Sequence, residues 1–327
     1  MLSGAAADLR VGDFTSRAVV PKVYGEALLE IAREDPRIVC LGADLSPATE
    51  TDLFRDALPD RFFNLGIAEA NMMGVAGGMA RCGDMPFAHT FGVFATRRPY
   101  DQVALQIAYP RANVKIVGFL PGLTTLLGVS HQAIDDLALM RALPNMTVLE
   151  PSGPAQVRAA VRAAARHDGP VYLRVRRAEG PLPADFEAEP LAIGRASVVR
   201  DGDDAVVFAC GAMVEIALAA ATTLAGAGHR VAVVNVATLK PLDAATVIQW
   251  ARRTGVVVTA ENHSIIGGLG SAVAETLLEA NVAARFARIG VRDTFAEGGS
   301  TPYLFDKYGL TAGAIADAVV RLRSRAP

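Results

Sequence analysis

The residues best able to do chemistry lie in loops that follow apolar, strand-like segments. One of them is Glu69, in the stretch GIAEAN, which follows the strand-like FFNL at 62–65 and enters a glycine-containing helix expected over 72–80. A carboxylate at such a junction can act as an acid or base, or it can only complement the helix dipole, which is worth about 0.3–1 kcal/mol. The glycines suit close approach by another backbone or by a flat ligand.

A second group combines aromatic and basic side chains. Phe91 and Phe94 lie near the end of an expected strand, and Arg97 and Arg98 follow them. Aromatic residues at this spacing pack in a core more often than they bind a ligand. The neighbouring arginines favour an anionic ligand that also carries an aromatic group.

The turn-rich segment 119–136 is long for a connection between a strand and a helix, and His131 lies near its end. No second histidine or cysteine is close in sequence, so we expect no metal ligand here. A lone histidine is usually structural, and the functional role open to His131 is that of a proton donor or a hydrogen-bond partner of a substrate.

Two further motifs have weaker signals. The stretch RVRRAEG at 174–180 leaves a strand with three arginines, which form either a solvated basic surface or a site for phosphate or sulfonate. The stretch ENHSIIGGLGSAVAE at 261–275 is similar to a dinucleotide-binding turn, but its glycine spacing is not GxGxxG. We therefore expect no nicotinamide site.

The elements that must position these residues alternate between short apolar runs and longer helical patterns. This rhythm is typical of βαβ units in parallel sheets that are buried on both faces. The expected strands lie at 37–42, 114–119, 147–150, 171–175, 205–210, 231–236, 255–260 and 286–291, and an amphipathic helix begins at Pro154.

The pattern predicts an α/β protein with two αβα three-layer domains. Three prolines and four acids over 179–190 indicate an exposed connection. We expect an N-terminal extension over 1–14, a first domain over 15–180, a linker over 181–195 and a second domain over 196–327.

The composition limits the class of protein. Of 327 residues, 51% are hydrophobic and 20% charged, which excludes a disordered chain, and the net charge of −2 gives no reason to expect nucleic acid as a partner. No secretory or membrane-spanning stretch is evident. Cys40, Cys82 and Cys210 form no CxxC pair, so we expect reduced core cysteines and a cytoplasmic protein.

Five stretches taken in order, GADLSPATE, FFNLGIAEANMMGVAGGMA, HTFGVFATRRPYDQV, VSHQAIDDLALMRALPNMTVLEPSG and AENHSIIGGLGSAVAE, resemble the C-terminal half of transketolase. The resemblance covers about residues 15–327 and is strongest to split transketolases, whose pyrimidine-binding and C-terminal domains form a separate subunit. Deoxyxylulose phosphate synthase and the beta subunit of 2-oxo acid dehydrogenases share this architecture.

The resemblance implies roles for several residues toward thiamine diphosphate. Glu69 would contact the pyrimidine ring nitrogen and share a proton with it, which prepares the cofactor to attack a ketose carbonyl. Phe94 would stack on the pyrimidine, with Phe91 beside it. The remaining cofactor-side positions implied by the resemblance are Asp44, Gly66 and Ile67.

On the substrate side, the resemblance assigns His131 to the hydroxyl groups of the sugar and makes Arg177 the best candidate for binding a terminal phosphate. Arg97 is a further candidate for substrate binding. The function implied is transfer of a two-carbon ketol unit from a ketose, a sugar phosphate or a modified sugar, to an aldose acceptor.

The family's diphosphate-binding motif, GDG followed by paired asparagines, is not found in this sequence, where Gly83-Asp84-Met85 lacks the asparagines. The resemblance therefore implies a separately encoded N-terminal subunit that holds the diphosphate and Mg²⁺, with no metal ligand on this chain. Two such pairs would form a heterotetramer.

Three positions depart from the family's polar pattern, namely Ala48, Leu120 and Leu127. Losing a buried hydrogen-bond partner costs about 1–3 kcal/mol for the substrate that needed it, so we expect a modified, less hydroxylated or differently charged sugar. Two alternatives stay open: the beta subunit of a 2-oxo acid dehydrogenase, and a non-catalytic binding protein with this fold.

Overall fold

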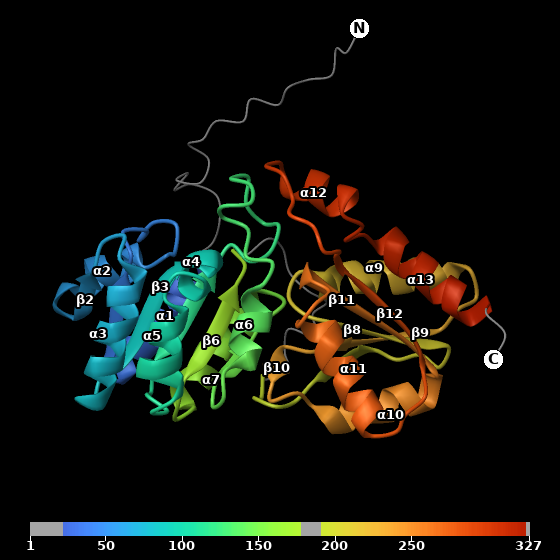
Figure 1. Cartoon of the computed structure of the whole chain (residues 1–327), viewed down its shortest axis with the longest axis horizontal. Coiled ribbons are helices and arrows are strands. Elements are labelled where there is room, and N and C mark those ends of the chain that lie inside the picture. The colour runs from blue at the N-terminus through green and yellow to red at the C-terminus, as the bar shows by residue number, and fades with distance from the viewer. Residues whose placement is uncertain (1–21, 178–190, 325–327) are drawn as a thin grey trace, which may run out of the picture.

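The computed structural model describes residues 22–177 and 191–324, which form two lobes side by side (Figure 1). The expected N-terminal extension, residues 1–14, lies outside the described residues. So does the expected linker up to residue 190.

Among the described residues, the sheet of the first lobe has seven strands in the order β10-β5-β6-β4-β3-β1-β2. Its strands are β1 (Ile38–Gly42), β2 (Phe62–Asn64), β3 (Met85–Phe91), β4 (Lys115–Phe119), β5 (Thr147–Leu149), β6 (Val171–Val175) and β10 (Thr238–Lys240). All neighbours are parallel except β10, which runs antiparallel to β5. The carboxyl ends of β1, β3, β4 and β6 therefore meet at one edge.

Helices cover both faces of this sheet. They are α1 (Val23–Glu34), α2 (Asp52–Ala57), α3 (Glu69–Arg81), α4 (Gly92–Thr96), α5 (Tyr100–Gln102), α6 (Asp136–Ala142) and α7 (Pro154–Arg166), with the 3₁₀ turn η2 (Pro59–Arg61) and the π-helical segment η3 (Val103–Ala108). On one face α1 packs along α7, and the ion pair Arg158–Glu26 (2.6 Å) joins their polar sides. Helices α3, η3 and α6 contribute to the apolar cluster on the other face.

The second lobe repeats this layering. Its described strands have the order β12-β11-β8-β9-β7 and are β7 (Ser197–Arg200), β8 (Ala205–Ala209), β9 (Val231–Asn235), β11 (Val256–Ser264) and β12 (Arg285–Val291). Its helices are α9 (Met213–Gly226), α10 (Ala244–Thr254), α11 (Leu269–Glu279), α12 (Thr301–Lys307) and α13 (Ala312–Ser324). Residues of α9 and α13 share one apolar cluster, and α10 and α11 pack on the opposite face.

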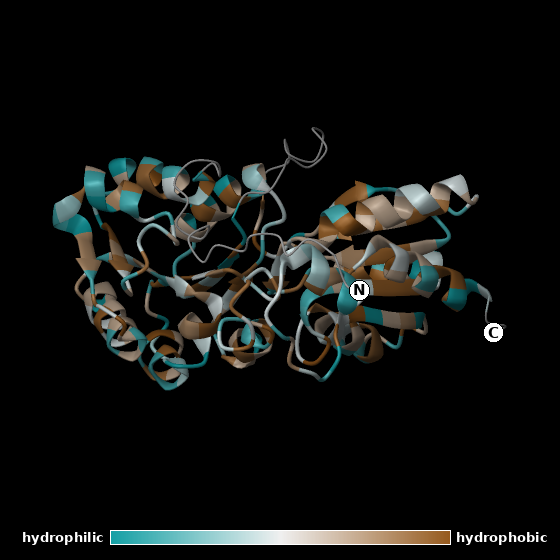
Figure 2. Ribbon diagram, turned by 90° about the horizontal axis from the view of Figure 1, so that it is seen from above, coloured by the Kyte–Doolittle hydropathy of each residue, from teal (hydrophilic) through white to brown (hydrophobic). Residues whose placement is uncertain are grey.

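The apolar core is continuous between the lobes. One cluster contains Leu41 and Ile116 from the first sheet together with Phe208 and Val257 from the second. Figure 2 shows the strands mostly in the hydrophobic colour, while hydrophilic segments lie on the outer helices. Burying so much apolar surface at the junction favours a fixed arrangement of the two lobes.

The structure confirms the predicted fold class, since each lobe is a sheet between two helical layers. It adds short antiparallel edge strands, β7 and β10, which the sequence pattern did not predict. Strand β10 comes from the second half of the chain yet completes the first sheet. The domain boundaries stay predictions.

The expectation that all three cysteines are core residues is wrong for one of them. Cys40 and Cys210 are buried, whereas Cys82 is exposed directly after α3, where the chain turns toward β3. Among the described helices, none is long and apolar enough to cross a membrane.

Candidate active site

Glu69 is the first residue of α3, and its carboxylate is only 4% exposed. The helix begins three residues earlier than the sequence pattern indicated, which places the carboxylate in the first turn, where the helix dipole favours negative charge. Arg98 donates a hydrogen bond from Nη1 to Glu69 Oε1 at 2.9 Å. A nearly buried carboxylate is thus paired with an arginine whose side chain is 47% exposed.

Three rings lie together next to this ion pair. Phe94 is 5.0 Å from His131 between ring centroids, in an edge-on arrangement, and Phe91 is 6.1 Å from each of them. The Arg98 guanidinium lies over the Phe94 ring with Cζ 3.9 Å from the centroid. The structure therefore brings Glu69, Phe91, Phe94 and His131 into one cluster, which Arg98 links.

His131 is carried by the long loop between β4 and α6. Its Nδ1 lies 2.9 Å from Ser130 Oγ, and its backbone amide donates to the carbonyl of Gly128 (3.0 Å). Burial, and secondly the charge of Arg98, lower the pKa of His131 below its usual value of 6.5. The imidazole is therefore neutral at neutral pH and can both donate and accept a hydrogen bond.

Arg97 holds this loop in place. Its Nε donates to both carboxylate oxygens of Asp135 (3.0 and 2.9 Å), and its Nη2 donates to the carbonyl of Gln132 at 3.4 Å. These contacts attach the end of α4 to the residues that flank His131. The assignment of Arg97 to the substrate stays a prediction.

A loop from the second lobe supports the His131 loop from outside. Gln132 donates from Nε2 to the carbonyl of Glu297 at 3.0 Å. A Cβ on Gly128 would lie 3.3 Å from the amide nitrogen of Gly298, so the two loops are in close contact. Both loops lie at the top of the molecule in Figure 1, between α4 and α12.

Asp44 and Gly66, which the resemblance predicts on the cofactor side, are joined by a residue that sequence reasoning missed, Asn64. Its Oδ1 accepts from the amides of Asp44 (3.0 Å) and Gly66 (3.1 Å), and its Nδ2 donates to Asp44 Oδ1 (3.1 Å). Asp44 has a φ of 61°, a conformation that is uncommon outside glycine and frequent near functional sites. A polar residue within the apolar stretch FFNL was the signal available in the sequence.

Ile67 follows Gly66 and precedes Glu69 by two residues, and 75% of its surface is exposed. Among the described residues, the large apolar side chains Leu127, Val129 and Phe295 are also exposed, on the two loops that meet beside His131. We call these four residues the apolar rim.

Close backbone packing sets the position of α4 and its aromatic residues. A Cβ on Gly118 would lie 2.5 Å from the hydroxyl oxygen of Tyr172 and 2.9 Å from the Cα of Gly92. Any side chain at residue 118 would collide with these atoms, so glycine at this position lets β4 and the start of α4 approach closely, directly after Phe91. The Phe91–Phe94 pair is therefore anchored to the sheet.

The structure places Arg177 after β6, apart from the cluster around Glu69, and no contact joins the two among the described residues. Arg177 lines a small hollow with Ser152, Gly153 and Pro154 at the N-terminus of α7. Its charge also acts on buried Glu50, whose pKa is raised chiefly by burial, with Arg177 opposing the shift. The predicted role of Arg177 in anion binding stays a prediction.

The three positions that depart from the family's polar pattern have different surroundings. Leu120 is buried, with a φ of 55°, and belongs to the same apolar cluster as Phe91. Ala48 packs against that cluster, and Leu127 is on the apolar rim. None of the three offers a polar atom on its side chain to a ligand.

The ENH stretch at 261–263 joins the two lobes. Asn262 accepts from the amide of Leu123 (2.9 Å) and donates to the carbonyl of Pro121 (3.1 Å), at the start of the His131 loop. Glu261 accepts from the amides of Leu269 and Gly270 at the N-terminus of α11. Its carboxylate holds that helix end, so the resemblance to a nucleotide-binding turn reflects a structural contact.

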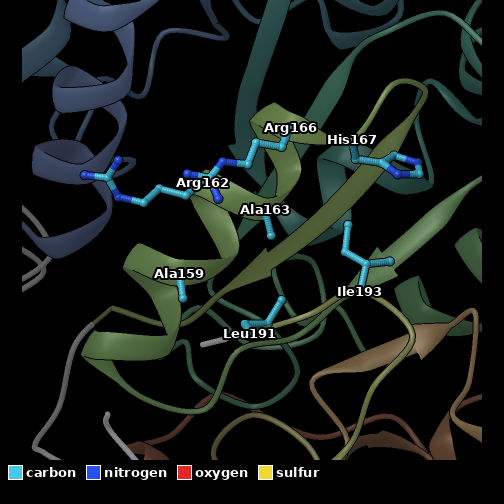
Figure 3. Close-up of a pocket in the computed structure, with 7 residues that line it drawn as sticks. All are labelled: Ala159, Arg162, Ala163, Arg166, His167, Leu191 and Ile193. Atoms are coloured by element: carbon cyan, nitrogen blue, oxygen red, sulfur yellow. The ribbon is translucent and has the colours of Figure 1, made fainter. Parts of the chain in front are cut away.

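A cavity of about 400 Å³ lies elsewhere, on the outer side of α7. Figure 3 shows its lining, which consists of Ala159, Arg162, Ala163, Arg166 and His167 together with Leu191 and Ile193. Arg162 is engaged there by Glu30 of α1 at 2.5 Å. This cavity is separate from the residues around Glu69.

The chemistry of the cluster around Glu69 suits a planar group that bears N–H donors. The nearly buried carboxylate can accept a hydrogen bond from an N–H, the ring of Phe94 can stack on the planar group, and the His131 ring lies at the edge of Phe94. Arg98 currently fills this arrangement with its guanidinium. Sequence reasoning noted Arg98 beside the aromatic residues but did not predict its contact with Glu69.

Comparison with known proteins gives matches along nearly the whole chain. Residues 17–183 match the family described as "Transketolase, pyrimidine binding domain", and residues 194–315 match "Transketolase, C-terminal domain". A 6-deoxy-6-sulfo-D-fructose transketolase subunit of Clostridium sp. (strain MSTE9) is 48% identical over 303 residues, covering 92% of this chain and 94% of the relative.

Other relatives agree with these matches. A putative transketolase C-terminal section of Methanocaldococcus jannaschii is 39% identical and covers 91% of this chain and 94% of the relative. The 1-deoxy-D-xylulose-5-phosphate synthase of Syntrophotalea carbinolica is also 39% identical, but the matched region spans only 47% of it.

A solved structure titled "Split gene transketolase, inactive beta4 tetramer" superposes with a TM-score of 0.84 at 47% identity, covering 93% of this chain and 97% of that one. Sequence and structure comparisons thus agree with the resemblance read from the five motifs. The chain belongs to the transketolase family, as a subunit of the split kind that consists of the pyrimidine-binding and C-terminal domains.

Proposed function

We propose that this chain is the pyrimidine-binding subunit of a thiamine-diphosphate-dependent enzyme that transfers a two-carbon ketol unit from a ketose to an aldose. The observation that carries the proposal is the cluster of Glu69, Phe94 and His131 in a subunit of this family. Thiamine diphosphate, when bound, supplies the carbon nucleophile that this chain's side chains lack.

The residues fit the aminopyrimidine of thiamine diphosphate. The same carboxylate and the same aromatic face already accept a planar N–H donor, the Arg98 guanidinium, at 2.9 Å from Glu69 and 3.9 Å from the Phe94 centroid. In the proposed complex, Glu69 Oε1 shares a proton with a ring nitrogen, and Phe94 stacks on the ring. Asp44, Gly66 and Ile67 form the neighbouring wall.

His131 acts on the substrate side of this arrangement. Its Nδ1 faces Ser130, and Nε2 has no partner among residues 22–177 and 191–324, so Nε2 is available to a sugar hydroxyl. Because its lowered pKa keeps the ring neutral at neutral pH, it positions the hydroxyl without adding a positive charge beside Arg98. The loop contacts of Arg97 hold it in that position.

The substrate we propose is a ketose with an anionic end, in particular a sulfonated one. Arg177, which follows β6, lines one hollow with the N-terminus of α7, and a guanidinium beside backbone amides suits a phosphate or a sulfonate. The relative named for 6-deoxy-6-sulfo-D-fructose supports the sulfonate, as do the apolar side chains at Leu120 and Leu127.

A separate N-terminal subunit would complete the site and hold the diphosphate with Mg²⁺. The apolar rim supports this, because Ile67, two residues before Glu69, is 75% exposed, and Phe295, on the loop that contacts the His131 loop, is 70% exposed. Exposed apolar groups of this kind mark interaction surfaces. The matched relative is itself named a subunit, which agrees with a paired enzyme.

The test is to purify the chain together with its N-terminal partner and to measure ketol transfer from each donor to ribose 5-phosphate, followed as formation of sedoheptulose 7-phosphate. We expect transfer with 6-deoxy-6-sulfofructose as donor to exceed transfer with xylulose 5-phosphate. Equal or greater turnover of xylulose 5-phosphate would contradict the sulfonated substrate. Turnover of 2-oxo acids with an artificial electron acceptor, and none of either ketose, would contradict ketol transfer itself.

A further inference from the structure

Arg98 makes the two contacts that the proposed function gives to the cofactor ring. One N–H of its guanidinium points to Glu69 Oε1 at 2.9 Å, and its plane lies over Phe94 with Cζ 3.9 Å from the ring centroid. No second acceptor for its remaining N–H groups lies among residues 22–177 and 191–324. The side chain is thus fixed by the catalytic cluster alone.

The chemistry of the Arg98 guanidinium suits the space between Glu69 and Phe94. The group is planar, delocalised and a hydrogen-bond donor, so it can stack on an aromatic ring and pair with a carboxylate at the same time. A half-exposed side chain, 47% accessible, can rotate into solvent without disturbing the core. Its backbone lies between α4 and α5, outside the rigid strands, which permits such a movement.

Two groups cannot occupy the same acceptor and the same ring face together. The pyrimidine would need Glu69 Oε1 and the stacking surface of Phe94, and both are taken by Arg98 in this structure. Arg98 also relieves Glu69 of being a nearly buried carboxylate without a partner, which would be unfavourable in the chain alone.

We propose that Arg98 is a placeholder for the cofactor ring: its guanidinium occupies the pyrimidine place in the chain alone, and binding of thiamine diphosphate displaces it. This inference rests on the proposed function. It makes the ion pair between Arg98 and Glu69 an internal competitor, so the affinity for the cofactor reflects the cost of breaking it. It also keeps the catalytic carboxylate and the aromatic face covered until the partner and cofactor arrive.

The direct test is calorimetric titration of thiamine diphosphate, with Mg²⁺, into the reconstituted pair. Removing a competitor worth one charge-assisted hydrogen bond should make binding to the Arg98→Ala pair about tenfold tighter than to the unaltered pair. Arg98→Lys should lie between the two, since lysine keeps the charge but lacks the planar face. The matched control is Arg158→Ala, whose ion pair with Glu26 lies on the outer side of α7, and it should bind as the unaltered pair does.

A second readout uses the chain alone and needs no cofactor. The charge of Arg98 contributes to the lowered pKa of His131. Titration of the histidine signals by NMR should therefore show the pKa of His131 higher in Arg98→Ala than in the unaltered chain or in Arg158→Ala. The other four histidines serve as internal references.

The outcomes separate the two proposals. If the unaltered pair binds no thiamine diphosphate, the proposed function fails, whereas the NMR titration still reports on the position of Arg98. If the unaltered pair binds the cofactor and Arg98→Ala binds it equally or more weakly, the placeholder is wrong, and Arg98 is instead a ligand or a bystander. An unchanged pKa of His131 in Arg98→Ala likewise contradicts the arrangement.

Discussion

Glu69 is the residue on which the proposed chemistry depends. A carboxylate that is 4% exposed, in the first turn of α3, and next to a stacking surface can hold a proton at one defined atom. Glu69→Gln keeps the shape of the side chain and removes this ability.

We therefore expect Glu69→Gln to lower kcat of the reconstituted pair by about 10²–10⁴-fold, the range for losing a positioned acid or base. Steady-state kinetics gives the change, and size-exclusion chromatography should show the pair still assembled. Retention of more than half of the turnover would remove Glu69 from the mechanism.

At the scale of single residues, the sequence selected side chains that the structure brings together, but it did not predict the contacts between them. The motif resemblance selected Glu69, Phe94 and His131, and the structure brings them together. The contact of Arg98 with Glu69 joins residues 29 positions apart, and Asn64 joins Asp44 to Gly66. Such contacts depend on how strand ends meet at the sheet edge, which residue spacing does not contain.

Among the elements, α3 must lie close to η3 to hold Glu69 in place. A Cβ on Gly77 would be 2.6 Å from the carbonyl oxygen of Gln106 in η3, whereas a Cβ on Gly78 would meet nothing within 4 Å. Gly77 therefore lies in the tight contact between α3 and η3, whereas Gly78 lies in open space.

Gly77→Ala should destabilise the chain by about 1–3 kcal/mol, because the two helical segments must separate. Gly78→Ala should stabilise it by about 0.5–1 kcal/mol, because alanine loses less conformational freedom in a helix. Urea unfolding of the chain alone measures both. A Gly77→Ala variant as stable as Gly78→Ala would show that α3 and η3 are not tightly packed.

The sequence pattern predicted elements where burial is uniform. Runs such as 171–175 and 231–235 are buried along their full length, so they read as continuous apolar segments. Strand β10 has only three residues, and it becomes a strand because it lies beside β5. The pairing of β10 with β5 depends on the tertiary fold, so the local sequence pattern around residues 238–240 does not predict it.

A buried charge network links the two lobes. Arg174, fully buried in β6, donates to Asp136 of α6 (2.8 Å) and to Glu150 (2.7 Å). It also donates to the carbonyl of Asn262 in β11 of the second lobe (2.9 Å). One guanidinium therefore compensates two buried carboxylates and links both sheets.

Arg174→Met should destabilise the chain by about 3–5 kcal/mol, since it leaves two buried carboxylates without their cation. Arg158→Met, which removes an exposed ion pair, should change the stability by less than about 1 kcal/mol. Urea unfolding compares them. A loss below 1 kcal/mol for Arg174→Met would mean that the network does not hold the lobes together.

The stability of the chain should also depend on pH through His89. Burial lowers the pKa of His89 to about 4 in the folded chain, where the ring lies between Tyr24 Oη (2.7 Å) and the carbonyl of Leu41 (3.0 Å). Between pH 6.5 and 4 the unfolded chain binds a proton there and the folded chain does not. The contribution of neutral His89 to the free energy of unfolding is fully present above pH 6.5. It is lost as the pH falls from 6.5 to 4, and the total loss is about 3 kcal/mol.

Other groups add to the pH dependence, and buried Glu261, whose pKa is raised to about 7, opposes that of His89. The contribution of His89 is isolated by the variant His89→Gln. Between pH 6.5 and 4.5, the slope of unfolding free energy against pH should be lower in His89→Gln by about 1.4 kcal/mol per pH unit. Identical slopes in the two proteins would show that His89 binds its proton equally well in the folded and unfolded chains, so that its pKa is not lowered by folding.

At the scale of the whole molecule, the central claim is that this chain supplies one side of a cofactor site and a separate subunit supplies the other. The measurement that tests it most directly is calorimetric titration of thiamine diphosphate with Mg²⁺ into the chain alone and into the chain paired with its N-terminal subunit. The account predicts no measurable binding or ketol transfer by the chain alone, and saturable binding with turnover by the pair. Tight cofactor binding and sustained turnover by the chain alone would contradict it.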